Sequence, residues 1–243
     1  MDKRKPITRE YIIGNNEREI RYTIFRKDCK RLCISVTPQL DVRITAPLDA
    51  PDSFINDALR EKTPWIIKSV DRLKNCTILP FPEKYISGEK IAYLGREINL
   101  KVLQGAGKKV ELSGDTLVVR VPAPDMKNVK REVDKWLRHQ AEIVFSRYLN
   151  KCYSVISGYC LSEPFLKIRK MKSRWGSCSR AGKVTLNLRL IHLPGVCIEY
   201  IVMHELCHLK HLNHSQSFYS FLQHCMPDWK ERKSILESYR LSI

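Results

Sequence analysis

The sequence predicts an α+β fold, in which an N-terminal region of antiparallel β-sheet and helices precedes a more helical C-terminal part. Polar and apolar residues alternate with period two in several short segments of the first half, for example 32–36 and 42–44. This alternation is typical of half-buried strands. Apolar residues recur at helical spacing in the segments that follow the strands. The composition, 43% hydrophobic and 28% charged, is that of a globular chain with a sizeable core.

The N-terminal strands are expected between residues 11 and 47 as an antiparallel meander. Residues that favour turns separate the alternating segments: Gly14-Asn15-Asn16, Lys27-Asp28 and Pro38-Gln39. Pro51-Asp52-Ser53 then favours the start of a helix. A second helical segment is expected over 65–73.

A similar plan recurs further along the chain. Strands are expected over 90–94, 97–103, 109–112 and 116–121, followed by a helix over about 125–155. Residues 42–47 and 119–124 match in residue type, and both end in Ala-Pro. Two interpretations stay open: a duplicated strands-then-helix unit, or two unrelated strand ends. We expect three parts, with the first strands and helix in 1–80, a second β region in 81–125 and a third part in 126–243.

The third part is expected to contain strands over 165–171 and 183–190 and helices over 196–212, 215–225 and 228–239. Its first half is strongly basic, since eight Lys and Arg and no Asp or Glu lie between Pro164 and Ile198. The whole chain has 43 Lys and Arg against 26 Asp and Glu, a net charge of +17. Nucleic acid, nucleotides and acidic peptides are therefore candidate partners.

A metal site is predicted by the histidines near the C-terminus. His204-Glu205-Leu206-Cys207-His208 is an H-E-x-x-H motif in a segment with helical periodicity. His204 and His208 are one helical turn apart, so both imidazoles can bind one ion.

A third ligand is expected from His214, because the spacing H-E-x-x-H-x5-H equals that of the metzincin motif. For His214 to reach the ion, the helix must end near 211–213. Asn213 can adopt the left-handed conformation of such an ending. His211 is expected to be an exposed neighbour, with a role as ligand as the alternative.

These residue types predict the chemistry of a hydrolase. Three neutral imidazoles leave Zn²⁺, or another divalent transition metal, with an open position for water. Glu205 is placed to take the proton of that water as it attacks, and to pass it to the leaving group. The expected reaction is hydrolysis at a carbonyl or phosphoryl centre.

The sequence resembles the YgjP-like metallopeptidase family. The resemblance is carried by residues 171–179, which include Arg-Trp-Gly-Ser-Cys, by 186–190, by 199–209 around the H-E-x-x-H motif, by His214-Ser215 and by Pro227-Asp228-Trp229. Residues 42–47 and Tyr93-Leu94-Gly95-Arg96 extend it into the N-terminal half. It therefore covers most of the chain.

The resemblance implies that 126–243 is a minimal gluzincin-like zincin domain, related to the SprT- and Wss-type proteases that act on protein bound to DNA. It implies that His204, His208 and His214 bind zinc and that Glu205 is the catalytic acid/base. The substrate stays open, because members are usually assigned as peptidases, but a pyrophosphatase activity on UTP has also been attributed to them.

Five residues before the metal motif are candidates for substrate binding. Trp175, Gly176 and Ser177 either form an edge strand that pairs with an extended substrate or form a structural turn with a buried Trp. Arg174 and Arg189 either steady an oxyanion or phosphate or belong to a solvated basic face.

Three functions are compatible with these features. The first is a zinc metallopeptidase that cleaves amide bonds in a polypeptide. The second is a metal-dependent nucleoside triphosphate (UTP) pyrophosphatase, although the sequence has no Gly-rich phosphate loop. The third is a nucleic-acid-associated protein with a structural metal, a role that would not need Glu205. Nucleic acid would bind the basic surface near 167–189.

The sequence also predicts where the protein is found. It has no apolar run long enough to span a membrane, and its start does not have the pattern of a secretory signal. Its nine cysteines include no CxxC pair, which favours reduced thiols. A cytoplasmic protein without membrane association is expected.

Overall fold

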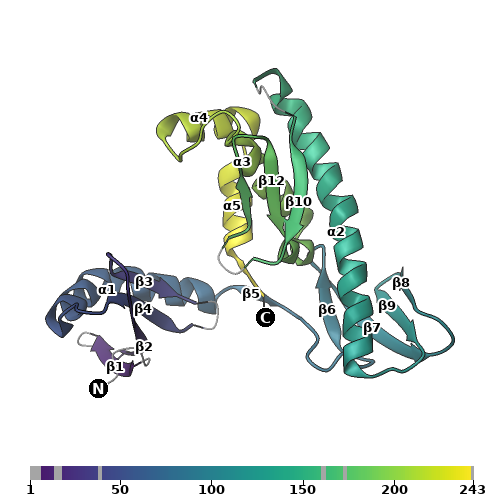
Figure 1. The fold of residues 1–243 in the computed structure, drawn as a ribbon, viewed down its shortest axis with the longest axis horizontal. Coiled ribbons are helices and arrows are strands. Elements are labelled where there is room, and N and C mark those ends of the chain that lie inside the picture. The colour runs from purple at the N-terminus through teal and green to yellow at the C-terminus, as the bar shows by residue number, and fades with distance from the viewer. Residues whose placement is uncertain (1–6, 14–17, 38–39, 160–162, 172–173, 242–243) are drawn as a thin grey trace. The chain divides into compact units, whose positions relative to one another are not determined.

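The computed structural model describes residues 7–13, 18–37, 40–159, 163–171 and 174–241 (Figure 1). It has the predicted α+β fold, with several small sheets and five α-helices in the described part of the chain. The chain forms two compact units, Met1–Thr77 and Ile78–Ile243, and each has its own hydrophobic core. The predicted turns at Gly14-Asn15-Asn16 and Pro38-Gln39 lie outside the described residues.

The sheet of the first unit is not the predicted antiparallel meander. Its strands are β1 (Ile7–Ile13), β2 (Arg18–Lys27), β3 (Cys33–Val36) and β4 (Val42–Pro47), in the order β1-β2-β4-β3. Strands β2 and β4 are parallel neighbours, and β3 is an edge strand. The reason lies in burial: Val42, Ile44 and Ala46 are almost completely buried, so β4 takes the interior position, whereas β3 is only partly buried. Alternation identifies a strand but not its neighbours.

One helix, α1 (Asp52–Lys74), follows this sheet, where two helical segments were expected. Pro64 lies inside it. Ile55 and Leu59 before the proline and Ile66 after it are all buried in the core of the unit. Because burial on both sides of Pro64 stabilises one continuous helix, the local effect of the proline is overridden.

The second unit begins with a sheet of the same topology. Its strands are β6 (Lys90–Tyr93), β7 (Arg96–Gln104), β8 (Lys109–Ser113) and β9 (Thr116–Val121), in the order β6-β7-β9-β8. In both units the outer pairs are antiparallel and the middle pair is parallel. A helix follows each sheet, here α2 (Met126–Ile156). The shared topology supports a duplicated unit over two unrelated strand ends.

The rest of the second unit holds a smaller sheet and three helices. Strands β10 (Phe165–Arg169), β11 (Gly176–Cys178) and β12 (Lys183–Asn187) form a sheet in the order β10-β12-β11. The 3₁₀ helix η2 (Leu188–His192) leads to α3 (Gly195–Cys207), α4 (Gln216–Cys225) and α5 (Trp229–Glu237). Figure 1 shows α2 running beside β10 at one end and beside the β6–β9 sheet at the other. The unit thus has one core through both sheets.

Short elements complete the fold. The 3₁₀ helix η1 (Ser157–Tyr159) follows α2. Strand β13 (Tyr239–Leu241) pairs with β5 (Thr77–Leu79) at the start of the second unit. Although α2 has 31 residues, neither it nor any other helix in the described ranges is apolar enough over its length to cross a membrane.

The hairpin between β6 and β7 connects the larger sheet to the segment before α3. Leu94 and Gly95 both have positive φ, 51° and 80°. Their N–H groups donate to the carbonyls of Ile191 (2.9 Å) and His192 (3.1 Å). The His192 ring in turn donates from Nδ1 to the carbonyl of Ala92 (2.7 Å). These bonds fix the segment before α3 relative to the sheet, and they depend on the turn at Leu94-Gly95.

Replacing Gly95 with alanine is expected to lower the free energy of unfolding more than the same change at Gly107. Both residues have similar φ, +80° and +85°, but only at Gly95 would a Cβ meet a neighbour, 2.6 Å from Pro194 Cγ. Overpacking of this kind costs roughly 1–3 kcal/mol. Denaturant unfolding of the two variants measures the difference. Equal losses would show that the hairpin does not pack tightly on Pro194.

Candidate metal centre

The helix that carries the first two histidines is buried on most of its surface. Ile198, Val202 and Leu206 of α3 are completely buried, and so is Cys207. Glu199, on the same helix, accepts ion pairs from Lys151 Nζ of α2 (2.7 Å) and Arg232 Nη1 of α5 (2.9 Å). Because α3 is packed on several sides and clamped by these charges, its last turn is a rigid support for side chains.

Helix α3 ends earlier than the sequence predicts. It stops at Cys207, and His208 is its C-cap. The N–H groups of His208 and Leu209 donate to carbonyls three residues back (3.2 and 2.9 Å), so the last turn tightens into a 3₁₀ turn. Asn213 is not among the non-glycine residues with positive φ in the described ranges, so it does not adopt the left-handed conformation that it could supply at such an ending. The tightened ending, one turn earlier, lets the chain reverse before α4.

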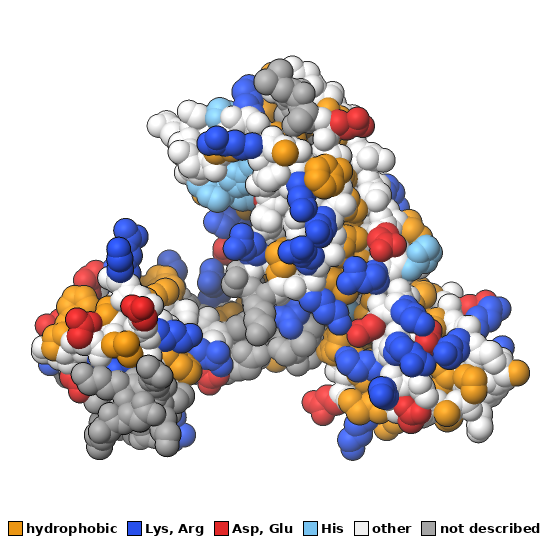
Figure 2. Space-filling model, in the orientation of Figure 1, with side chains coloured by type: hydrophobic (Ala, Val, Ile, Leu, Met, Phe, Trp, Pro, Cys, Tyr) orange, Lys and Arg blue, Asp and Glu red, His pale blue; other side chains and the backbone are white. Residues whose placement is uncertain are grey.

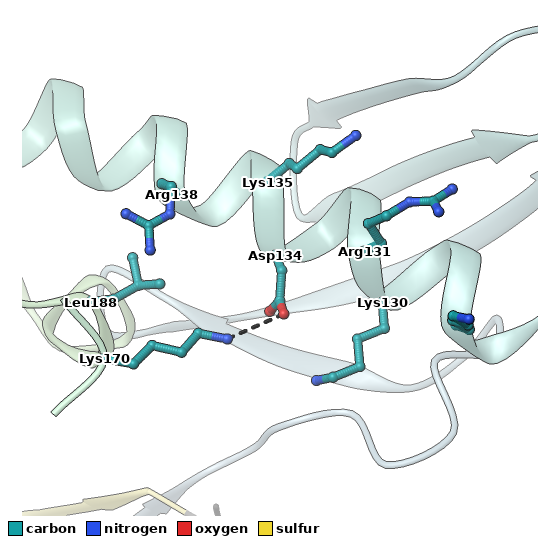
Figure 3. A pocket seen from close by; sticks show the side chains of 8 residues that line it. Lys130, Arg131, Asp134, Lys135, Arg138, Lys170 and Leu188 are labelled. Carbon is teal, nitrogen blue, oxygen red and sulfur yellow. Dashed lines mark hydrogen bonds and ion pairs between the residues drawn. The ribbon is translucent and has the colours of Figure 1, made fainter. Parts of the chain in front are cut away.

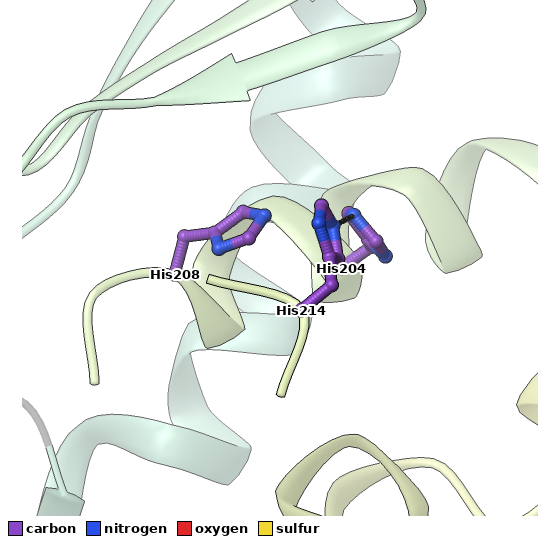
Figure 4. Close-up of side chains that lie close together, drawn as sticks. All are labelled: His204, His208 and His214. Carbon is purple, nitrogen blue, oxygen red and sulfur yellow. Dashed lines mark hydrogen bonds between the residues drawn. The ribbon is translucent and has the colours of Figure 1, made fainter. Parts of the chain in front are cut away.

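This reversal brings His214 back to the end of α3, where three imidazoles meet (Figure 4). One ring nitrogen from each of His204, His208 and His214 lies within 4.8 Å of the others. Nε2 of His204 and Nε2 of His214 are 2.9 Å apart. Nδ1 of His208 lies 2.9 Å from the carbonyl of His211. Since a carbonyl only accepts, Nδ1 carries the proton, and Nε2 of His208 keeps its lone pair for a metal.

Burial favours the neutral, metal-binding form of His204 and His214. Burial, together with the smaller effect of the nearby His208 and His214 rings, lowers the pKa of His204 to about 4. Burial and His208 also lower the pKa of His214. Nδ1 of His204 is buried and has no hydrogen-bond partner among the described residues. Three neutral imidazoles are a donor set suited to zinc and to other divalent transition metals.

Phe218 of α4 packs against all three rings, although it was not predicted to be part of the site. Its ring centroid lies 5.0 Å from that of His204, 4.7 Å from His208 and 4.8 Å from His214. The side chain is completely buried. No spacing in the sequence identifies it, because His214 lies before α4 and does not share a helix with Phe218. Phe218 therefore restricts the orientation of the three imidazole rings.

Glu205 lies beside the histidines in an apolar environment. Only 6% of it is exposed. Burial raises its pKa to about 7, and the positive charge of Arg174 opposes this shift. A carboxyl group with a pKa near neutrality can both accept and donate a proton at pH 7.

Gly176 of β11 lies directly against Glu205. A Cβ at this position would be 2.6 Å from both Cγ and Oε1 of the glutamate. A side chain here would therefore displace the carboxylate. The predicted residues Arg174, Gly176 and Glu205 are thus close together. Arg189 instead lies near His192, whose pKa is lowered mainly by burial and to a smaller extent by the charge of Arg189.

Strand β11 is an edge strand of its sheet. The Asn187 N–H donates to the Trp175 carbonyl (2.8 Å), and the Ser179 N–H donates to the Lys183 carbonyl of β12 (3.0 Å). Hydrogen-bonded pairs alternate along an antiparallel ladder. Gly176 and Cys178 therefore direct their backbone N–H and C=O groups away from β12. An edge strand is observed over Gly176–Cys178, and Trp175 before it is partly buried against the core. Pairing of this edge with a substrate stays a prediction.

Asn187 holds the segment before β11 in place, and the sequence did not reveal this role. Its side-chain amide donates to the carbonyls of Met171 and Arg174, both at 2.9 Å. Its Oδ1 accepts from the N–H groups of Arg189 (3.2 Å) and Met171 (3.3 Å). Residues 172–173, part of the sequence resemblance, lie outside the described ranges.

Imidazoles that can hold a metal, next to a carboxyl group of near-neutral pKa and a sheet edge, are typical of metal-dependent hydrolases. The chain belongs to the YgjP-like family, because the family's YgjP-like, metallopeptidase domain matches residues 30–239. The protein is accordingly a metal-dependent hydrolase, and the family supports a metal-dependent protease.

Two solved structures show local likeness to the chain. The metallopeptidase zymogen of Pyrococcus abyssi abylysin is 25% identical, with a TM-score of 0.34, over 38% of this chain and 90% of that one. The metallopeptidase zymogen of Methanocaldococcus jannaschii jannalysin is 22% identical, with a TM-score of 0.33, over 38% of this chain and 86% of that one. No curated protein shows a significant match. The family assignment rests on the match over 30–239.

Proposed function

We propose that the protein is a zinc peptidase in which His204, His208 and His214 hold Zn²⁺ and Glu205 is the general base and acid. The observation that carries this proposal is the buried Glu205 carboxyl group, with a pKa of about 7, beside three converging imidazoles. A purely structural metal would leave the burial of this carboxyl group unexplained.

The zinc ion and the side chains of the protein would each contribute part of the chemistry. Zinc in such a site lowers the pKa of a bound water and polarises a carbonyl group. Glu205 takes the proton released as water attacks the carbonyl carbon, and then delivers it to the nitrogen of the leaving amine. Arg174, the cation whose charge acts on Glu205, is our candidate for steadying the negative charge that develops on the substrate oxygen.

The substrate proposed is an extended polypeptide paired with β11. The outward backbone groups of Gly176 can exchange hydrogen bonds with a peptide laid along this edge. Backbone pairing does not depend on side chains, so we expect broad sequence tolerance. Unfolded polypeptides expose the extended backbone that this mode requires.

The experiment that tests the function compares substrates with metal loading. We expect about one zinc ion per chain by metal analysis, cleavage of a casein-type peptide, complete loss of cleavage with a chelator, and recovery with added zinc. UTP serves as the alternative substrate. Metal-dependent release of pyrophosphate from UTP without peptide cleavage would replace the peptidase proposal with the nucleotide pyrophosphatase.

A further inference from the structure

A basic groove of about 440 Å³ lies beside α2, and none of the three metal-site histidines lines it (Figure 3). Six of its eight lining residues are Lys or Arg. We call it the α2 groove, defined by Lys127, Lys130, Arg131, Asp134, Lys135, Arg138, Lys170 and Leu188. Figure 3 shows the side chains of α2 leaving successive turns, with Lys170 reaching toward them from the segment after β10.

The positive charge of the α2 groove is only partly neutralised. Asp134, its one acidic lining residue, pairs with Lys170 at 3.2 Å. Glu132, next to the groove, accepts from Arg131 (3.2 Å) and Lys135 (3.1 Å). Six cations therefore face two carboxylates, and an anion can be bound without displacing either acid.

The cations form a row. From Lys127 to Arg138 they recur every three to four residues on one face of α2. At a rise of 1.5 Å per residue the row is about 16 Å long. A nucleic acid strand carries one phosphate per 3.4 Å of helix axis, about five phosphates over this length. A single nucleotide is much shorter than the row.

The positive surface continues along the neighbouring sheet. Figure 2 shows Lys and Arg side chains gathered over β10 and the adjoining part of α2. Lys167 of β10 lies close enough to Arg169 and to Lys183 of β12 that their charges lower its pKa. Between Pro164 and Ile198 the chain has no Asp or Glu. A long anion leaving the groove would therefore stay on a basic surface.

The residues that line the groove favour the binding of phosphates over the docking of a protein. Protein partners are usually anchored by exposed apolar or aromatic side chains. No lining residue is aromatic, and the one apolar residue, Leu188, is buried. Backbone phosphates require only cations. We infer that the α2 groove binds the phosphate backbone of a nucleic acid.

This surface is joined to the candidate metal centre through the chain itself. Lys170 lies six residues before Gly176, and Asn187 bonds the carbonyls of Met171 and Arg174 between them. A nucleic acid in the groove would hold a protein bound to it near the edge strand β11. The binding inference does not depend on the proposed peptidase activity.

The test removes three exposed cations and compares salt dependence. The variant Lys127→Gln/Lys135→Gln/Arg138→Gln and wild type are titrated with fluorescent 24-base-pair duplex DNA and with the single strand, from 50 to 200 mM salt. Because each lost phosphate contact reduces the slope of log K against log[salt] by about 0.9, we expect the slope to fall by roughly 2 to 3. Affinity at 100 mM should fall at least about tenfold.

The matched control is Arg60→Gln/Lys68→Gln/Lys74→Gln, which removes the same charges from exposed positions of α1. It should keep most of the wild-type affinity. Equal losses in both variants, or no binding of wild type to either probe at 50 mM salt, would overturn the inference. Displacement of DNA by polyglutamate at equal charge concentration would instead assign the groove to acidic proteins. Peptide cleavage without DNA, measured in parallel, tests the proposed function separately.

Discussion

Replacing Glu205 with glutamine is expected to lower peptide turnover by about 10²–10⁴-fold, the range typical for loss of a general acid or base. Glutamine has nearly the same shape as glutamate but cannot take a proton from water. The effect should appear in kcat, because Glu205 acts on the reacting water and leaving group. Steady-state kinetics with a casein-type peptide measure it, with zinc content determined on the same samples.

The zinc content of Glu205→Gln should remain close to that of wild type, since the proposed ligands are the three histidines. This separates lost chemistry from a lost metal. Turnover within a few-fold of wild type, with metal bound, would remove Glu205 from the mechanism. Lost metal together with lost activity would instead make Glu205 a structural part of the site.

The same variant has a signature in the pH dependence of stability. Burial raises the pKa of Glu205 from 4.5 to about 7. A raised pKa means that this group's stabilising contribution is complete below pH 4.5 and is lost as the pH rises through 7. In metal-free protein, the free energy of unfolding of Glu205→Gln should therefore rise by about 3 kcal/mol relative to that of wild type between pH 4 and pH 8. The lowered pKa of His204 is common to both proteins, so it cancels in the comparison.

Local patterns predicted most elements of the fold closely. The helix expected over about 125–155 is α2 (Met126–Ile156), because Asp125 caps it by accepting from the Asn128 N–H (2.8 Å) and its apolar residues repeat at helical spacing. The parallel pairing of β2 with β4 was not predicted. This pairing depends on which strand is buried in the interior of the sheet, with a neighbour on each side. That is a property of tertiary packing rather than of any one segment.

In the candidate site, too, local patterns predicted some residues, and the residues that depend on tertiary packing were missed. His204, Glu205 and His208 follow from a spacing that a helix must place on adjacent turns, and His214 from a known motif. Phe218 and Asn187 were missed as site residues. They act through contacts with rings and carbonyls that only the folded chain brings near, and no spacing rule encodes such contacts.

Replacing Gly176 with alanine is expected to lower kcat by about 10²-fold while leaving zinc bound. The new Cβ would lie 2.6 Å from Oε1 and Cγ of Glu205, so the carboxyl group must move. A misplacement of about 1 Å can cost this much in rate. The matched control is Ser177→Ala on the same strand. This change adds no atom, so it cannot push against Glu205, and it should keep near-normal kcat.

A double-mutant cycle shows whether Gly176 acts through Glu205. Glu205→Asp alone withdraws the carboxyl group from the strand and should lower kcat by itself. Adding Gly176→Ala to it should cost little more, because the shorter side chain leaves room for the Cβ that clashes in the single variant. Coupled effects of this kind would make Gly176 a positioning residue for the carboxyl group. Strictly additive losses would contradict that role, and would mean that alanine disturbs the pairing of substrate with the edge of β11 instead.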